Sequence, residues 1–135
     1  MQRRAYLSVV AGASVALAGC GGGREEYGDW FSNVDNYDGE IDRTGEGRVV
    51  VAVGADDGFA FDPAAIQVDA GTAVSWQWTG TGGRHNVVER GGAFASPYYQ
   101  DAGEAWEYTF DEAGLFPYYC DPHREMGMKG GVRVE

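Results

Sequence analysis

The sequence predicts an all-β protein, with a Greek-key β-sandwich of seven to eight strands formed by residues 48–135. Short apolar runs with a period of two recur in this region, and this is the spacing of side chains on one face of a strand. Turns rich in Gly and Asp separate the runs at intervals typical of sandwiches, and no helical period is sustained after residue 48. A chain of 135 residues is long enough for one core and a tail.

The first two predicted strands are rich in Val and Ile. Residues 49–53 form a continuous apolar run, which indicates a strand buried on both faces. Ile66 and Val68 alternate with polar residues until a turn begins at Asp69. The pattern therefore predicts a second strand with only one buried face.

The later strands carry most of the aromatic residues. In residues 74–78, a valine and two tryptophans share one face of a predicted strand. Residues 106–110 show the same alternation of aromatic and polar residues, and in residues 132–135 valine alternates with charged residues. A ligand-stacking role for these rings is the alternative to a core role. Large apolar side chains at strand spacing are usually buried, so we expect these aromatic residues to form the core.

The N-terminal region is predicted to be a targeting segment and a tether. Residues 1–19 have a basic start with Arg3-Arg4 and an apolar run too short to span a bilayer, which is typical of a twin-arginine export signal. Leu17-Ala18-Gly19-Cys20 has the form of a lipoprotein cleavage site, which predicts a lipid on Cys20; the alternative is a plain export signal with an incidental cysteine. Residues 20–47 are then a lipid-anchored tether and leader, whose aromatic residues are too apolar for a fully solvated spacer.

The charge of the chain excludes one class of partner. Its 21 acidic and 10 basic residues give a formal charge of −11, and Lys129 is its only lysine. Binding to nucleic acid needs a basic surface to neutralise phosphates, so we expect no nucleic acid partner. An acidic surface poor in lysine is also found in proteins of extreme halophiles, although an ordinary acidic protein is the alternative.

The cysteine and histidine content predicts a metal site. Cys20 is assigned to the lipid, which leaves Cys120 without a disulfide partner in an exported protein, where a lone thiol is prone to oxidation. His85 and His123 are the only two histidines, and Met126 and Met128 follow closely. One thiolate is too few for the usual structural zinc sites, whereas two His, one Cys and a weak axial Met are the ligands of blue copper.

The motifs around these residues resemble those of the small blue copper proteins of the plastocyanin type, and most closely the membrane-attached halocyanins. The segments are Gly82-Gly83-Arg84-His85-Asn86 and Tyr119-Cys120-Asp121-Pro122-His123, and Met128-Lys129-Gly130-Gly131 follows after four intervening residues. The resemblance extends from about residue 30 to the end of the chain. It implies a cupredoxin-like fold and one type 1 copper ion.

The resemblance also implies a role for each residue of the site. His85, Cys120 and His123 are the equatorial ligands, and the family spacing favours Met128 over Met126 as the axial ligand. Asn86 ties the histidine loop to the cysteine loop, with an ordinary turn asparagine as the alternative. Pro122 lacks a backbone N–H beside the thiolate, so we expect fewer hydrogen bonds to the sulfur and a lower potential.

The implied function is electron transport without catalysis. A blue copper protein carries single electrons between redox partner proteins, here membrane complexes of a respiratory chain, with the chain a monomer on the extracellular side of the cell membrane. A copper store or delivery protein is the alternative, which the extra methionine favours slightly. Blue copper enzymes need further histidines for a catalytic copper, and none remain after His85 and His123. We therefore expect no enzyme activity.

Overall fold

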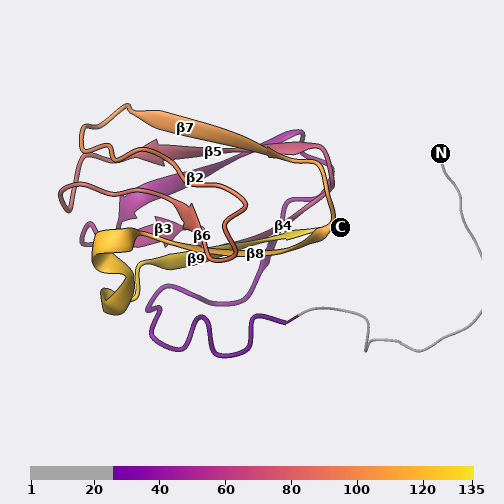
Figure 1. Ribbon diagram of the computed structural model, residues 1–135, viewed down its shortest axis with the longest axis horizontal. Helices are drawn as coiled ribbons and strands as arrows, with labels where there is room; N and C mark the ends of the chain where they lie inside the picture. The colour runs from indigo at the N-terminus through magenta and orange to yellow at the C-terminus, as the bar shows by residue number, and fades with distance from the viewer. Residues whose placement is uncertain (1–25) are drawn as a thin grey trace, which may run out of the picture.

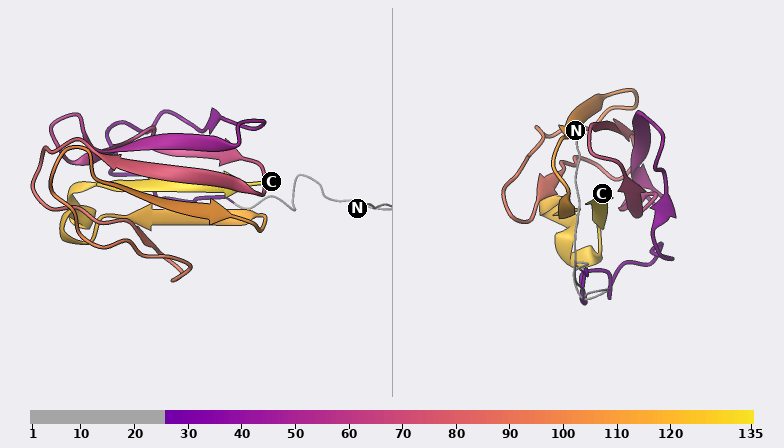
Figure 2. Two further views of the ribbon diagram at one scale, coloured as in Figure 1. Left: turned by 90° about the horizontal axis from the view of Figure 1, so that it is seen from above. Right: turned by 90° about the vertical axis from the view of Figure 1, so that its right-hand side faces the viewer.

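The computed structural model describes residues 26–135, which form two β-sheets packed face to face (Figures 1 and 2). One sheet has the order β1-β4-β9-β8-β6, with bounds Ile41–Asp42, Ala65–Val68, Lys129–Val134, Gly114–Tyr119 and Val88–Glu89. The other has the order β3-β2-β5-β7, with bounds Ala60–Asp62, Arg48–Ala55, Thr72–Trp78 and Ala105–Phe110. The predicted export signal and the lipid site at Cys20 lie outside the described residues.

The predicted all-β sandwich is confirmed. Each of the five apolar runs of the sequence lies in a strand, namely β2, β4, β5, β7 and β9. The described residues contain nine strands rather than seven or eight, and two of them, β1 and β6, are only two residues long. Within residues 26–135, no helix is long and apolar enough to cross a membrane.

The prediction that residues 49–53 are buried on both faces is wrong. Val49, Val51 and Val53 are buried, but Val50 is 44% exposed and Ala52 is only partly buried. Strand β2 therefore has the one-sided burial of a sheet whose outer face meets solvent. Valine is favoured in strands on either face because its branched side chain suits the pleated backbone.

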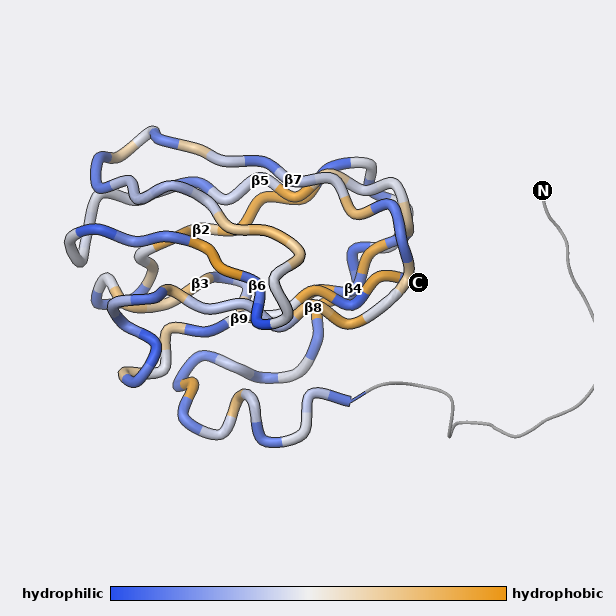
Figure 3. The backbone as a smooth tube through the Cα atoms, viewed as in Figure 1, coloured by the Kyte–Doolittle hydropathy of each residue, from blue (hydrophilic) through white to orange (hydrophobic). Residues whose placement is uncertain are grey.

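The aromatic residues of strands β5 and β7 form the core, although two of the three on β7 are only partly buried. Trp76 is fully buried at the centre, where its ring packs against Phe94, Trp106, Phe110 and Tyr118. Trp106 and Tyr108 are only partly buried, because β7 is the last strand of its sheet. Burying such a side chain contributes roughly 1.5–3 kcal/mol, so this cluster is a major part of the stability. In Figure 3 the strongest hydrophobic colour lies on strands such as β4 and β8, whereas much of β5 and β7 is pale and the loops are mainly hydrophilic.

The sandwich brings distant loops to one end of the molecule. Strand β2 pairs in parallel with β5, and β4 pairs in parallel with β9, so the chain crosses between the sheets. The loop after β5 (residues 79–87, the histidine loop) and the 3-10 helix η2 (Asp121–Met126) after β8 lie at the same end, opposite the C-terminus (Figure 1). At this end the side chains of His85 and Cys120 meet, although the two residues are 35 positions apart in the sequence.

The leader (residues 26–47) packs on the sandwich, as its apolar residues predicted. Trp30, Phe31 and Val34 are buried in a second apolar cluster with Ala64 and Ala65. Strand β1 pairs in parallel with β4 and extends that sheet by one short strand. The described leader is therefore part of the folded unit.

Candidate metal centre

Three donor atoms meet at the end of the sandwich that carries the histidine loop. The Nδ1 atoms of His85 and His123 are 3.2 Å apart, and Cys120 Sγ is 3.6 Å from the first and 3.4 Å from the second. The point equidistant from all three lies about 2.0 Å from each, close to the length of a metal–imidazole bond. The three side chains therefore form a planar cradle of the size that one metal ion needs.

His85 is held rigidly by its own loop. Its side chain is 1% exposed, and its backbone exchanges two hydrogen bonds with Tyr99. Its Nε2 lies 2.8 Å from the carbonyl oxygen of Thr81. Because only a protonated Nε2 can donate to that oxygen, Nδ1 carries the free lone pair that a metal would accept.

The backbone at Gly82, three residues before His85, has no room for a side chain. Gly82 has a φ of +91°, and a Cβ atom there would overlap the carbonyl oxygen of Gly58 and lie 2.9 Å from His85 Nε2. Gly82 thus has a steric cause, since the loop there must approach both the imidazole and the neighbouring turn, whereas Gly83 has open space around it and is favoured by its φ of +86°. Trp78 donates its indole N–H to the His85 carbonyl at 3.1 Å, which fixes the loop from the core side.

Cys120 follows strand β8 and is fully buried. Burial raises the pKa of its thiol, while the backbone N–H groups of Asn86 and His123 lower that pKa in part. The thiol is therefore protonated near neutral pH until a metal displaces the proton. The expectation that Pro122 leaves the sulfur with fewer hydrogen bonds, and the site with a lower potential, stays a prediction.

His123 lies in helix η2 and is the least buried of the three donors. Asp121 and Pro122 begin the helix, and His123 donates its backbone N–H to the Cys120 carbonyl at 3.1 Å. Burial and the nearby His85 ring lower the pKa of His123. The ring of Phe59, from the turn between β2 and β3, packs edge-on against it at 4.9 Å. The imidazole is partly buried, and its neighbours along the helix are exposed.

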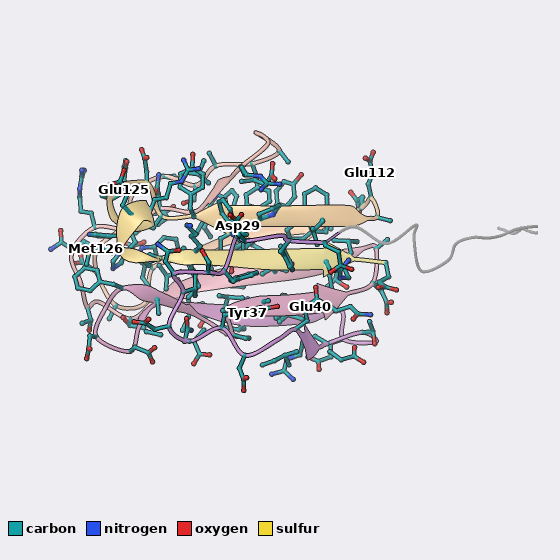
Figure 4. The ribbon with its side chains drawn as sticks, turned by 90° about the horizontal axis from the view of Figure 1, so that it is seen from below. Asp29, Tyr37, Glu40, Glu112, Glu125 and Met126 are labelled. Carbon is teal, nitrogen blue, oxygen red and sulfur yellow. The ribbon has the colours of Figure 1, made fainter. Side chains whose placement is uncertain are left out.

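The two methionines lie in opposite environments. Met128 is fully buried, its carbonyl accepts from the Cys120 N–H at 3.0 Å, and its N–H donates to the His123 carbonyl at 3.2 Å. Met126 is 59% exposed and lies at the tip of η2, beside Glu125 (Figure 4). Burial beside the other donors therefore favours Met128 as the fourth member of the set.

Asn86 joins the two loops directly. Its Oδ1 accepts a hydrogen bond of 2.8 Å from the backbone N–H of Asp121, and the side chain is buried. Arg84, next to His85, turns outward and stacks over Tyr98 at 4.5 Å. The histidine loop and the cysteine loop are thus connected in the protein itself, without any contribution from a metal.

Sequence reasoning missed three of the residues that surround the donors. Thr81 lies four residues before His85, so the short spacing could have suggested it, and Trp78 precedes the same loop. Phe59 offers no such sign, because only the three-dimensional path of the turn at 56–59 brings it to His123. Asp56 in that turn has a φ of +57°, which is uncommon outside glycine.

The donor set defines a class of metal centre. One thiolate and two imidazoles in a plane, with a thioether nearby, are the soft ligands of type 1 copper rather than the thiolate-rich set of structural zinc. A sequence profile of the copper binding proteins of the plastocyanin/azurin family matches residues 48–135. The chain belongs to this family, whose members bind one type 1 copper ion.

Three known proteins show the range of the similarity. Halocyanin from Natronomonas pharaonis is 54% identical over 104 residues, which cover 73% of this chain and 64% of the halocyanin. Oxidised plastocyanin from Dryopteris crassirhizoma superposes with a TM-score of 0.54 at 27% identity, covering 64% of this chain and 99% of the plastocyanin. A copper-containing nitrite reductase from Thermus scotoductus SA-01 superposes with a TM-score of 0.56 at 26% identity, over 65% of this chain but 22% of the reductase.

Proposed function

We propose that this chain carries single electrons, with one copper ion held by His85, Cys120, His123 and Met128. The observation that carries the proposal is the cradle of three donor atoms, 3.2–3.6 Å apart, in which only His123 reaches the surface. Copper would supply the change between Cu(I) and Cu(II). The protein would supply the geometry and the path to a partner.

The hydrogen bonds around the donor residues hold the proposed copper site in a fixed geometry. Asn86 holds the two loops together, and the backbones of Cys120, His123 and Met128 are joined by their own hydrogen bonds. These bonds are present before any metal binds, so the donors need little rearrangement when the charge of the metal changes. Small rearrangement is the requirement for fast electron exchange.

Two other functions are weaker candidates. A copper store or delivery protein needs an open site, whereas His85, Cys120 and Met128 are each no more than 1% exposed. A reductase needs a second, catalytic metal site. Both histidines of the sequence are already used here, and the chain matches only 22% of the nitrite reductase.

The attachment of the chain forms the second part of the proposal. Cleavage before Cys20 would remove residues 1–19 and leave a lipid-anchored tether of a few residues before the leader. The domain, residues 48–135, would then stand on the extracellular side of the cell membrane. There, as a monomer, it would exchange electrons with protein complexes of a respiratory chain.

An absorption spectrum tests the first part. Adding Cu(II) to the metal-free protein should produce an intense blue thiolate-to-copper band, and cyclic voltammetry should show one reversible one-electron wave. A protein that binds copper without the band, or with an irreversible wave, would be a store rather than a carrier.

Fractionation of cells tests the second part. The Cys20→Ser variant should move from the membrane fraction to the soluble fraction with its blue band unchanged, because Cys20 lies outside the domain. A variant that stays in the membrane fraction would contradict lipid attachment at this residue.

A further inference from the structure

The residues on both sides of Met128 contact the leader. The carbonyl oxygen of Gly130 accepts a buried hydrogen bond of 2.9 Å from the indole N–H of Trp30. The Lys129 ammonium donates to Asn33 Oδ1 at 2.9 Å and to the Trp30 carbonyl at 3.4 Å, and it lies 4.9 Å from the Trp30 ring. Lys129 is also the only lysine of the sequence.

Gly127 on the other side of Met128 is just as close to the leader. Its φ is +95°, and a Cβ atom there would overlap the carbonyl oxygen of Asn33. The Asn33 amide also reaches the Glu125 carbonyl at 3.5 Å. Arg124, earlier in helix η2, lies over the rings of both Trp30 and Tyr119.

The leader is fixed to the sandwich independently of these contacts. Phe31 and Val34 are buried with Ala64 and Ala65 of the sandwich. Asn36 donates to the Phe61 carbonyl at 2.7 Å. Strand β1 then pairs with β4. Figure 4 shows Asp29, Tyr37 and Glu40 of the leader lying across the β9 face of the molecule. A segment anchored in this way can hold another one in place.

We propose that Trp30 and Asn33 act as a brace that positions the Met128 end of the ligand loop (residues 120–128). Asn86 holds the start of this loop at Asp121, and the brace holds its end. An axial thioether bonds weakly to type 1 copper, so the bond itself does little to place the methionine. The backbone must place it instead. The leader lies outside the region that the family profile matches, so this support is additional to the family fold.

Trp30→Phe removes the indole donor but keeps an aromatic ring beneath the cations. The buried Gly130 carbonyl then lacks its partner, and such a loss should speed local opening by about fivefold or more. We expect amide hydrogen exchange at residues 127–130 of the metal-free protein to rise by this factor. In the copper-loaded protein, transfer of copper to a chelator should rise similarly, and the ratio of the visible absorption bands should shift. Asn33→Ala, at an exposed position, should act in the same direction.

Phe31→Leu is the matched control. Phe31 belongs to the same buried cluster as Trp30, but the aromatic rings that it packs against are Tyr27 and Tyr37 of the leader. The Phe31→Leu variant should have a lower melting temperature, but its amide hydrogen exchange at residues 127–130 and its ratio of visible absorption bands should not change. The brace is refuted if Trp30→Phe and Asn33→Ala leave that exchange unchanged, or if Phe31→Leu raises it equally. The role assigned to Met128 rests on the proposed copper function; the exchange experiment needs no copper, so a protein that fails to turn blue still tests the brace.

Discussion

The two histidines of the centre have the same side chain and opposite surroundings. His85 is 1% exposed, its Nε2 is held by Thr81, and its backbone is paired with Tyr99. His123 lies on a short helix with no buried residues, and its ring has Phe59 as its aromatic neighbour on the outer side. One histidine is built into the fold, and the other is presented at the surface.

The difference divides the centre into two halves with separate tasks. The buried half (His85, Cys120 and Met128) is held by backbone hydrogen bonds and, in the proposed function, would determine which metal is bound and at what potential. The outer half (His123, Pro122, Met126 and Phe59) would determine how electrons reach that metal. Changes in the first half should therefore alter the spectrum and the potential. Changes in the second should alter only rates of exchange.

Cys120→Ser should have the largest effect, because the thiolate supplies the blue band. We expect complete loss of the band with added Cu(II), and a circular dichroism spectrum that keeps its β-sheet form, since the core lies elsewhere. Cys20→Ser serves as the control and should keep the band. A blue Cys120→Ser protein would mean that the ligand assignment is wrong.

Met128→Gln should keep copper but stabilise Cu(II), since a harder oxygen replaces the soft thioether. A tenfold change in the relative affinities corresponds to about 59 mV for a one-electron couple, so we expect the potential to fall by about that amount or more. Met126→Gln, at a position 59% exposed, should leave the potential unchanged. Voltammetry of the two variants compares them directly, and the reverse ranking would assign the axial role to Met126.

Asn86→Ala should separate the two loops by removing the acceptor of the Asp121 N–H. Losing one buried hydrogen bond costs about 1–3 kcal/mol, so we expect a lower melting temperature for the metal-free protein and about tenfold faster release of copper. Asn86→Asp retains an acceptor and should release copper more slowly than the alanine variant. If both variants release copper like the original protein, Asn86 is only a turn residue.

Much of this division could be predicted from the sequence, because strand periodicity and ligand spacing are local properties. The spacing in the family that the sequence resembles favours Met128 over Met126, and the burial of the two side chains agrees with that preference. Partners from distant segments could not be predicted. The contacts of Phe59 with His123 and of Trp30 with Gly130 join residues that only the complete fold brings together. The exposure of Val50 could not be predicted for a related reason, since a run of valines does not indicate which face of the strand is covered by the rest of the protein.

The smallest expected effect belongs to the outer half. The apolar area around the His123 ring consists of Met126, Pro122 and the ring of Phe59, with Asp56 and Asp57 beside Met126 and Phe59. We expect the His123 ring to be the shortest path from the centre to a docked partner. In about 1 M salt the screening length is only about 3 Å, so apolar contact rather than long-range charge should control docking there.

Met126→Glu places a charge in this apolar area and should slow the rate of electron exchange with a redox partner by about threefold to tenfold, because the carboxylate must lose water when the partner docks. The copper spectrum and potential should stay unchanged, since Met126 does not contact the buried half. Ala113→Glu adds the same charge next to Glu112, at the opposite end of the molecule (Figure 4), and should not change the rate. Stopped-flow measurement at high salt compares the two variants. If they exchange electrons equally fast, the path does not leave through His123, and the exposure of that ring has another cause.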